Sequence, residues 1–566
     1  MSLKIKPYAL NVSPTQLPEH WHEVVKRIYA ARIQCPEEVD KGGRNVLGWE
    51  ALRDADKAAY RLSQAIEAGE RILIYGDYDV DGATAVALCV RVLRALGAVV
   101  EWFVPRREVH GYGLNLRGLA EIKRRGALPS VLMTVDNGIV AHEAVARANA
   151  LGIDCIITDH HLPAGSLPEA LAVVNPNRLD CDFESKALAG VGVAFYVLLA
   201  LRAVQLEKGL WPEALQLRNY LDLVALGTIA DVAQLDYNNR ILLHLGLKKM
   251  RMASANMGIR ALCAVGNVEA QYLTAQEVAF ALAPRLNAIG RLGDMSEAVA
   301  LLLSEDWQSA QEYAQQAEAC NRKRKAIENT MLDEALLQVD ERQAVLCVYD
   351  AQWHEGVLGL VAGRLKSRFS RPVVVGCDAL GATHIKASVR CVEGICAQKL
   401  LTEAAKRLGA GRLSFGGHAM AAGLTVAKED FSLLTLHLQQ AYEYLFGARE
   451  IEEVVWVDGR LPVELMQAPW AEYFSHLEPW GAGFPEPMFV NIFELLDYRM
   501  LGTQHCRLVL REPESGQVLQ AVWFFHQLKY PLKGLVEVVY TLQVNRFYGD
   551  ARLQLLVQHL NESPCL

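Results

Sequence analysis

The sequence contains the stretch Gly76-Asp77-Tyr78-Asp79-Val80-Asp81-Gly82, in which three aspartates stand at alternate positions. An apolar run, residues 71–75, leads into it, and a helical pattern, residues 83–96, follows it. A strand that stops at acids, with a helix starting at once, is typical of the edge where an open α/β sheet presents its active site. Alternate carboxylates converge there when a divalent cation cancels their repulsion. The alternative is a solvated acidic turn.

Two further apolar segments end in the same way. Residues 131–135 close on Asp136, and residues 153–158 close on Asp159-His160-His161. Both are short and rich in β-branched residues, and helical stretches alternate with them, which predicts a parallel sheet. Adjacent histidines at such a strand end are candidate ligands or charge-stabilising donors, and the alternative is a pair of ordinary core histidines. Because parallel strands share one C-terminal edge, the residues expected to meet there are Asp79, Asp81, Asp136, His160 and His161.

The composition describes a well-cored protein with several domains. The chain has 566 residues, which predicts three or four domains, and 52% of them are hydrophobic. Its net charge of −8 counts mildly against a nucleic-acid partner, but binding depends on local patches. Such patches are residues 123–125, residues 322–325 and the basic residues between 364 and 371. The alternative is that each patch is a solvated helix face.

The cysteines and the N-terminus indicate a cytoplasmic protein. The twelve cysteines are scattered without C-x-x-C spacing, as expected of reduced thiols in the cytosol. Residues 1–18 lack the apolar core of a signal peptide. We also find no run of about 18 apolar residues, so we expect no membrane span and no membrane partner.

The pattern along the chain changes several times. Residues 1–45 look like a loosely structured extension with one short helix. Strand–helix alternation then predicts a first α/β domain, and residues 306–339, which lack glycine and proline, predict a long connecting helix. A second α/β domain follows. The expected divisions are 1–45, 46–235, 236–340, 341–446 and 450–566.

The C-terminal region has the composition of an all-β domain. Alternating runs at residues 453–457, 506–510, 536–544 and 552–557 are separated by glycine and proline turns. Five or six strands in this length fit a small barrel, and an OB-fold is the candidate because such barrels stack bases on aromatic side chains. The alternative is that each aromatic belongs to the barrel core. The aromatic residues concerned are Trp523, Phe524, Phe525, Tyr530, Tyr540, Phe547 and Tyr548.

These acidic and histidine motifs, in this order, resemble the signature of the DHH phosphoesterase superfamily. Within it, the chain is similar to the bacterial exonucleases that degrade single-stranded DNA from the 5′ end. The resemblance runs from about Gly76 to Gly423. Its further motifs are His110-Gly111-Tyr112-Gly113, Asn175-Pro176 and residues 227–232, 284–292, 353–359 and 415–423. The implied architecture is a parallel-sheet DHH domain, a long connecting helix, a DHH-associated α/β domain and a C-terminal OB-like barrel.

The resemblance implies a site with two divalent ions, Mn²⁺ or Mg²⁺. Two such ions about 3.5–4 Å apart can hydrolyse a phosphodiester, and the donors are oxygen and nitrogen without thiolate. By similarity, Asp136 bridges the ions, Asp79 and Asp81 each bind one, and Asp231 completes the shell. His160 and His161 lie at the metals or at the scissile phosphate. Asp77 is a ligand or orients one, and Asp159 has a supporting role.

The second α/β domain is expected to hold substrate. Glycines let a backbone approach a phosphate, while serine, arginine and histidine donate to its oxygens. The sequence departs from the family pattern at Ala387 and Cys391, which puts Cys391 in doubt as a phosphate contact. The alternative is an ordinary hairpin. The candidate substrate-binding residues are His110, Arg291, Ser388, Arg390, Gly416, Gly417 and His418.

Three functions remain to be distinguished. The first is a 5′→3′ exonuclease for single-stranded DNA in recombination and repair, acting as a monomer. A single-strand-binding protein and a helicase are its candidate protein partners. The second is a DHH phosphoesterase acting on pyrophosphate, oligoribonucleotides or small nucleotides. The third is a non-catalytic replication scaffold of the same fold. The C-terminal region favours the first, because the phosphoesterases are typically shorter, and the intact aspartates disfavour the third.

Overall fold

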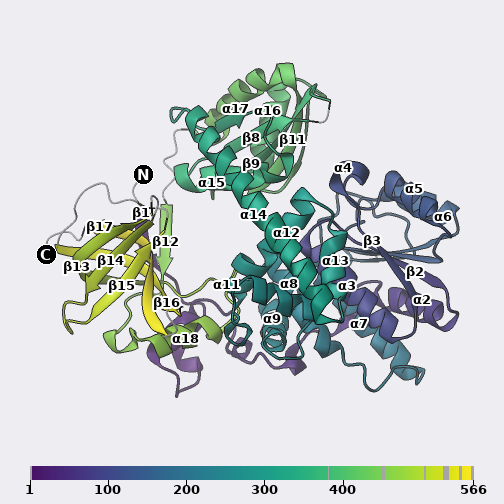
Figure 1. Cartoon of the computed structure of the whole chain (residues 1–566), viewed down its shortest axis with the longest axis horizontal. Coiled ribbons are helices and arrows are strands. Elements are labelled where there is room, and N and C mark those ends of the chain that lie inside the picture. Colours follow the sequence, from purple (N-terminus) through teal and green to yellow (C-terminus); the bar gives the residue numbers. More distant parts are fainter. Residues whose placement is uncertain are drawn as a thin grey trace. The chain divides into compact units, whose positions relative to one another are not determined.

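The computed structural model of this chain describes residues 3–379, 381–447, 453–502, 505–524, 526, 534–546 and 551–562. The chain folds into two compact units, which are considered separately below (Figure 1). The smaller unit consists of Met1–Ser2, Ala288–Gly293 and Gln316–Glu453, and the larger unit consists of Leu3–Asn287, Asp294–Gln315 and Val454–Leu566.

The larger unit contains the predicted parallel sheet. Its strand order is β3-β2-β4-β5-β6, and all neighbours are parallel. The chain leaves β2 to form β3 on one side and later returns to form β4 on the other. The sheet therefore has a topological switch point between β2 and β4, where α/β proteins bind ligands. The strands are β2 (Arg71–Tyr75), β3 (Val99–Phe103), β4 (Val131–Val135), β5 (Asp154–Thr158) and β6 (Ala172–Val174).

Helices pack on this sheet and on one another. Side chains of α5 (Leu116–Arg125) and α6 (His142–Ala150) share a core with the sheet side chains Leu73, Leu132 and Ile157. A second group of helices packs together, in which α7 contacts α2, α3 and α8. Helix α3 is buried along almost its whole length, as its nearly continuous apolar sequence requires. This group is α2 (Ala55–Glu67), α3 (Val80–Ala95), α7 (Gly190–Glu207) and α8 (Leu221–Ala230).

Helix α7 corrects one expectation from the sequence. It is long and apolar enough to cross a membrane by length and composition, although no such run was expected. Most of it is buried inside the protein, where it packs on α2 and α3. Core helices of soluble proteins pass the same test, so α7 is only weak evidence for a membrane span.

The region after the first α/β domain is helical, as expected. The predicted connecting helix is α14, which runs for 32 residues. Earlier in the chain, the short helix α11 continues directly into a π-helical turn, Val278–Leu282, here called the π-turn. The helices are α9 (Tyr237–Met250), α10 (Met257–Val265), α11 (Ala275–Glu277), α12 (Ala283–Leu292), α13 (Ser296–Leu303) and α14 (Trp307–Gln338).

The smaller unit contains the second α/β sheet, in the order β10-β11-β9-β8-β7. Strands β7 and β8 are parallel, and the other neighbours are antiparallel. Helix α15 (Leu358–Phe369) packs in one core, and α16 (Ala397–Leu408) and α17 (Phe431–Phe446) pack in another. The strands are β7 (Leu346–Tyr349), β8 (Val373–Asp378), β9 (His384–Arg390), β10 (Leu413–Gly417) and β11 (Ala421–Ala427).

The C-terminal region forms the predicted closed five-stranded barrel (Figure 1). Tyr540 is fully buried in it and Trp523 nearly so, whereas Phe524 is exposed. The aromatic residues Phe525, Tyr530, Phe547 and Tyr548 lie outside the described residues. The barrel strands are β13 (Phe489–Leu501), β14 (His505–Arg511), β15 (Val518–Trp523), β16 (Gly534–Asn545) and β17 (Arg552–Glu562), and α18 (Ala468–Leu477) precedes them.

The N-terminal segment differs from the expected loose extension. Strand β1 (Leu3–Pro7) pairs with β12 (Glu453–Val457), so β12 lies in this two-stranded sheet and not in the barrel, contrary to expectation. Helix α1 (Glu23–Ala30) buries Ile28 and Tyr29. The N-terminal segment is therefore packed against the segment that precedes the barrel.

Buried ion pairs fix this contact. The guanidinium of Arg32 donates to both carboxylate oxygens of Asp458, at 2.6 and 2.9 Å. The carboxylate of Glu478 accepts from the hydroxyl of Tyr29 at 2.7 Å and from the ammonium of Lys41 at 2.5 Å. Both acids are buried, so removing a cation would leave an unpaired charge in a dry interface.

We predict that Arg32→Ala strongly destabilises the larger unit. The side chains of Arg32 and Asp458 are 2% and 0% exposed, and the broken pair leaves a buried carboxylate without its partner. Losses of about 3–5 kcal/mol are typical of such pairs. The free energy of unfolding, measured with urea and circular dichroism, tests this.

Arg44→Ala is the matched control in the same segment. Arg44 also pairs with an aspartate, Asp40, but the two side chains are 82% and 44% exposed. Its loss is expected to cost less than about 1 kcal/mol. Equal losses in the two variants would mean that the Arg32 pair does not hold the chain ends together.

Candidate metal centre

The acidic stretch lies at the end of β2 and the start of α3. Asp77 is buried in the turn between them. Asp79 is the N-cap of α3, and its carboxylate accepts a hydrogen bond from the backbone N–H of Gly82 at 3.0 Å. The helix start thus holds Asp79 in one orientation, because the cap satisfies an N–H that has no partner within the helix.

Asp81 lies in the first turn of α3 and faces the start of α7. Its carboxylate accepts from the backbone N–H of Gly190 at 2.6 Å and of Val191 at 2.9 Å. The N-terminus of a helix favours a negative charge, so α7 stabilises and orients this buried carboxylate.

Asp136 follows β4 and adopts a left-handed backbone conformation, with φ of 63°. It packs directly on the start of α7. A Cβ atom on Gly190 would lie only 2.5 Å from the Cβ of Asp136, so no larger residue fits there. Gly190 therefore allows α7 to approach the site closely. Gly190 was not identified from the sequence. The feature that could have indicated it is its position at the start of a long apolar helix.

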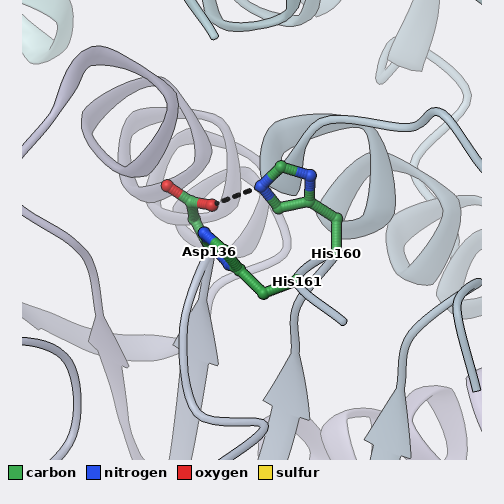
Figure 2. Close-up of side chains that lie close together, drawn as sticks. All are labelled: Asp136, His160 and His161. Carbon is green, nitrogen blue, oxygen red and sulfur yellow. Dashed lines mark ion pairs between the residues drawn. The ribbon is translucent and has the colours of Figure 1, made fainter. Parts of the chain in front are cut away.

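The two histidines follow β5 and point toward the aspartates. Figure 2 shows the ring of His160 turned toward the carboxylate of Asp136, with Nε2 3.1 Å from Oδ1. Nδ1 of the same ring is 4.0 Å from the carboxylate of Asp231, at the end of α8. His161 lies beside His160, with ring centroids 4.5 Å apart. The edge predicted from the sequence therefore forms.

Asp159 holds the histidine turn in place. Its carboxylate accepts from the backbone N–H of His160 at 2.8 Å and of His161 at 3.1 Å, and it lies 2.7 Å from Nδ1 of His161. Its other oxygen accepts from the N–H of Ile139 at 2.9 Å. With its oxygens engaged in this way, Asp159 orients its neighbours, which matches the supporting role expected for it.

The donor atoms form three overlapping groups, in each of which all atoms lie within 4.8 Å of one another. Asp136 and His160 each belong to two groups, so they connect the others. Such sharing is what a pair of neighbouring cations requires. The groups are Asp77, Asp79 and Asp136; Asp136, His160 and His161; and Asp81, His160 and Asp231.

Burial and mutual repulsion raise the pKa values of these carboxyls. The pKa of Asp81 and that of Asp231 rise to about 7, because burial disfavours their charge and neighbouring aspartates repel it. The pKa values of Asp77 and Asp136 rise well above the ordinary value for the same reasons. The carboxyls therefore lack the positive charge that would favour their ionised form, which a divalent cation would supply.

The two histidines differ in their electrostatics. Burial lowers the pKa of His160, which keeps its ring neutral and able to ligate a metal. Burial alone would also lower the pKa of His161, but the hydrogen bond and charge of Asp159 outweigh it and raise this pKa to about 9. His161 is therefore a candidate donor to an anionic group.

The donors fit a hard divalent cation. In the described part of the chain, Oδ1 of Asp77 is buried without a hydrogen-bond partner, and Oδ1 of Asp136 is buried with no hydrogen bond besides its 3.1 Å approach to Nε2 of His160. Unsatisfied buried carboxylate oxygens are costly, and a bound cation would satisfy them. Carboxylates with imidazole and no thiolate suit Mn²⁺ or Mg²⁺.

The predicted substrate residue His110 lies away from the histidine pair. Its Nδ1 accepts from the backbone N–H of Arg106 at 3.0 Å, and its ring packs on Phe103 with centroids 5.4 Å apart. Tyr112, two residues later, instead approaches the site, with its hydroxyl 3.5 Å from Nε2 of His161. His110 stays a predicted substrate contact, whereas Tyr112 was not singled out in the sequence as a residue that reaches His161.

In the smaller unit, Ser388 and Arg390 lie on one face of β9. The guanidinium of Arg390 donates to the hydroxyl of Ser388 at 2.8 Å and to the carbonyl of Val389 at 2.9 Å. Among the described residues, Arg390 forms no ion pair with a carboxylate. Its charge is thus available to a phosphate. Cys391, by contrast, is buried in the core, as its doubtful role suggested.

The predicted glycines continue this surface. Gly416 of β10 pairs with Gly423 of β11, which pairs with Ser388 of β9. A Cβ atom on Gly416 or Gly423 would meet open space, so the backbone here is accessible. Gly417 ends β10, and His418 is exposed in the turn that follows.

Arg291 contacts a different turn of this unit. Its guanidinium donates to the carbonyl of Gly356 at 3.0 Å, in the turn that precedes α15. The contact holds the start of α15, so Arg291 has a structural partner in addition to any substrate.

Several arginines of the basic patches pair with acids. Arg124 and Arg125 pair with Glu121, at 2.8 and 3.1 Å. Arg364 pairs with Glu328 at 2.9 Å, and Glu328 also pairs with Arg324. Arg124 and Arg125 are exposed, as expected of a solvated helix face, whereas Arg324 and Glu328 are buried and form an interior ion pair.

Three family models match this chain. The DHH family N-terminal domain matches residues 71–228, the DHHA1 domain matches residues 342–443, and the RecJ OB domain matches residues 457–559. Together they cover the metal centre except Asp231, the smaller unit's sheet and almost all of the barrel.

Full-length relatives are similar over almost the whole chain. The single-stranded-DNA-specific exonuclease RecJ of Dickeya dadantii (strain 3937) is 41% identical, over 96% of this chain and 97% of the relative. The enzyme of the same description from Escherichia coli (strain K12) is 39% identical, over 96% of each.

The structure is also similar to solved ones. The crystal structure of RecJ in complex with Mn²⁺ from Thermus thermophilus has a TM-score of 0.82 and 30% identity, covering 100% of this chain and 80% of that one. The corresponding structure in complex with Mg²⁺ has a TM-score of 0.77 and 29% identity, covering 100% and 79%. With identity this high over nearly its full length, the chain belongs to the RecJ family.

Proposed function

We propose that this protein is a metal-dependent exonuclease that hydrolyses single-stranded DNA from the 5′ end, in DNA recombination and repair. The observation that carries the proposal is the convergence of buried aspartates and histidines at one sheet edge, in a chain of the RecJ family. The test is digestion of end-labelled single-stranded DNA with Mn²⁺ or Mg²⁺, using strands blocked at the 5′ or the 3′ end. Digestion of a 5′-blocked strand from its 3′ end would contradict the direction.

The residues at this edge are proposed to hold two ions, Mn²⁺ or Mg²⁺. Asp136 is assigned as the shared ligand, because its carboxylate belongs to two of the three donor groups. His160 is assigned as a neutral ligand, since burial lowers its pKa. The remaining proposed ligands are Asp77, Asp79, Asp81 and Asp231, with His161 at the metals or at the scissile phosphate.

When bound, divalent ions supply an activated water and neutralise phosphoryl charge. The chain's own residues position the reactants. Asp159 fixes the ring of His161 and favours its charged form, so Nε2 of His161 can donate to a phosphoryl oxygen. The hydroxyl of Tyr112 lies 3.5 Å from the same Nε2, where the phosphoryl oxygen would bind.

The smaller unit is proposed to hold the strand by its phosphates. Arg390 and Ser388 offer donors on one strand, and the accessible backbone of Gly416 lies in the same row of the sheet. Gly417, His418, Arg291 and His110 remain proposed substrate contacts. The barrel, which a phosphoesterase for small nucleotides would not need, favours a long strand as substrate.

Several finer points are also part of the proposal. The enzyme acts in the cytoplasm as a monomer, and a single-strand-binding protein and a helicase are its proposed partners. Reduced thiols are consistent with this location, since none of the eleven cysteines of the described part forms a disulfide.

We predict that Asp136→Asn lowers nuclease activity by several orders of magnitude. Both ions would lose a charged ligand, while asparagine tolerates the left-handed backbone at this position better than alanine. Single-turnover digestion of labelled strands at saturating Mn²⁺ measures the loss.

Glu143→Gln is the control, because this exposed residue of α6 also loses one carboxylate charge. It should keep full activity, and both variants should bind single-stranded DNA normally. Asp136→Asn with more than about a tenth of the activity would contradict the two-ion assignment.

We predict that the protein without divalent ions becomes less stable to unfolding as pH rises. Asp81 and Asp231 have pKa values raised to about 7 in the folded protein, so the folded state binds more protons than the unfolded state from about pH 4 to 7. Each unit by which a pKa is raised corresponds to about 1.4 kcal/mol of folding stability, and this stability is lost as pH rises through this window. Thermal unfolding with chelator from pH 5 to 8 should show a falling midpoint.

A bound cation favours the charged carboxylates, so Mn²⁺ should remove or reverse this slope. Asp231→Asn, which removes one titrating group, should make the chelated protein's slope shallower. The same slope with and without Mn²⁺ would show that these carboxyls do not bind the ion.

We predict that Arg390→Gln raises KM with metal affinity unchanged. One charge-assisted phosphate contact would be lost, worth about 1.5–3 kcal/mol, or roughly ten- to hundredfold. Steady-state kinetics and Mn²⁺ calorimetry measure the two quantities.

Arg407→Gln is the matched control on the surface of α16, where Arg407 already pairs with Glu403 at 3.0 Å. It should leave KM unchanged. Loss of a metal ion from Arg390→Gln would mean that this residue belongs to the metal centre.

A further inference from the structure

A pocket of about 410 Å³ lies beside the metal centre within the larger unit. Ala230 and Val232 line it, and they flank Asp231, whose carboxylate is 4.0 Å from Nδ1 of His160. Its volume is in the range of about 300–1,000 Å³ that is typical of ligand pockets. The pocket therefore begins one residue from a proposed metal ligand and has no role in the chemistry derived above.

The walls of this pocket are mostly apolar. Ile229 and Leu235 come from the end of α8 and the loop after it, Phe280 comes from the π-turn, and Trp480 comes from the segment before the barrel. The residues that line it include no lysine, arginine or histidine, and its one acid is Glu486. A phosphate would find no cation here, whereas an aromatic ring would be well accommodated.

Two features at the rim are costly unless they serve a ligand. Val232 has a φ of 58°, unfavourable for a β-branched residue, and is 71% exposed. Phe280 is 77% exposed, on a π-helical turn. Strained residues and π-helical turns are frequent at functional sites.

We propose that this pocket binds a base of the substrate strand, with the ring stacked on Phe280, while a phosphate of the same strand lies at the metal centre. The inference rests on the proposed function and adds a base subsite to it. In a single strand the bases are free to turn outward, and every base has a face that stacks on an aromatic ring.

The polar atoms of the pocket suit the edge of a base. Thr228 and Asn287 line it together with Glu486. Burial raises the pKa of Glu486 to about 7, as expected of a carboxyl among apolar groups. A hydroxyl, an amide and a carboxyl can pair with either donors or acceptors, so the subsite is expected to accept all four bases.

The test uses strands with one abasic residue. A 3′-labelled strand is shortened from its 5′ end, so the abasic residue reaches the pocket at a fixed distance from the cleaved bond. Wild-type enzyme should pause there, with cleavage slowed about five- to hundredfold, as expected for one lost base–aromatic stack. Moving the abasic residue along the strand should move the pause by the same number of nucleotides.

Phe280→Ala should slow cleavage of normal strands by a similar factor and abolish the pause, since the stack is already lost. Phe280→Trp should restore both. Phe280→Leu, which keeps apolar area without an aromatic face, should behave like alanine. Tyr60→Ala, at an exposed aromatic of α2, is the control and should retain the wild-type pause.

Absence of a pause in the wild type, or a pause that persists in Phe280→Ala, would overturn the base subsite. In that case the pocket binds something else, such as an apolar side chain of another protein. Failure to shorten normal strands would instead contradict the proposed nuclease function, so the two outcomes are distinguishable. Because Phe280 is exposed, unchanged melting temperatures should confirm that its variants fold.

Discussion

The repulsion between buried carboxylates at one sheet edge is the constraint on which the rest of the structure depends. Asp77, Asp81 and Asp136 are brought together by strand order, although their charges oppose it. The scaffold offsets part of this cost by directing the N-terminus of α7 at Asp81. Helix α7 can approach the aspartates this closely because residue 190 is a glycine, which has no Cβ atom to clash with Asp136. The repulsion that remains between the carboxylates favours the binding of a cation at this edge.

The division of labour between the two units follows from this concentration of negative charge. An acidic edge repels a polyanionic strand, so phosphate contacts have to come from elsewhere or through the cations. In the smaller unit, Arg390 has no acidic partner among the described residues. The backbone of β10 and β11 is accessible there at Gly416 and Gly423. In the larger unit, an apolar pocket beside Asp231 receives a part of the strand without charge. Each surface thus suits a different chemical part of one polymer.

Much of this arrangement could be predicted from the sequence. Short β-branched runs ending in acids indicated the parallel sheet and the meeting of Asp79, Asp136 and His160. Contacts between residues distant in the chain could not be predicted in this way. The alternation of β12 indicated a strand but not its partner, which is β1 at the other end of the chain. Likewise, Tyr112 rather than His110 approaches His161, because a turn decides which way each side chain points.

The pairing of the chain ends has a consequence for biosynthesis. Arg32 and Asp458 are 426 residues apart. At about 5–20 residues per second, the ribosome would deliver the aspartate roughly 20–85 s after the arginine. Throughout that interval β1 and α1 lack the segment that covers them. The nascent N-terminus is therefore a natural substrate for chaperones, and closure of the larger unit is expected to be a late step in folding.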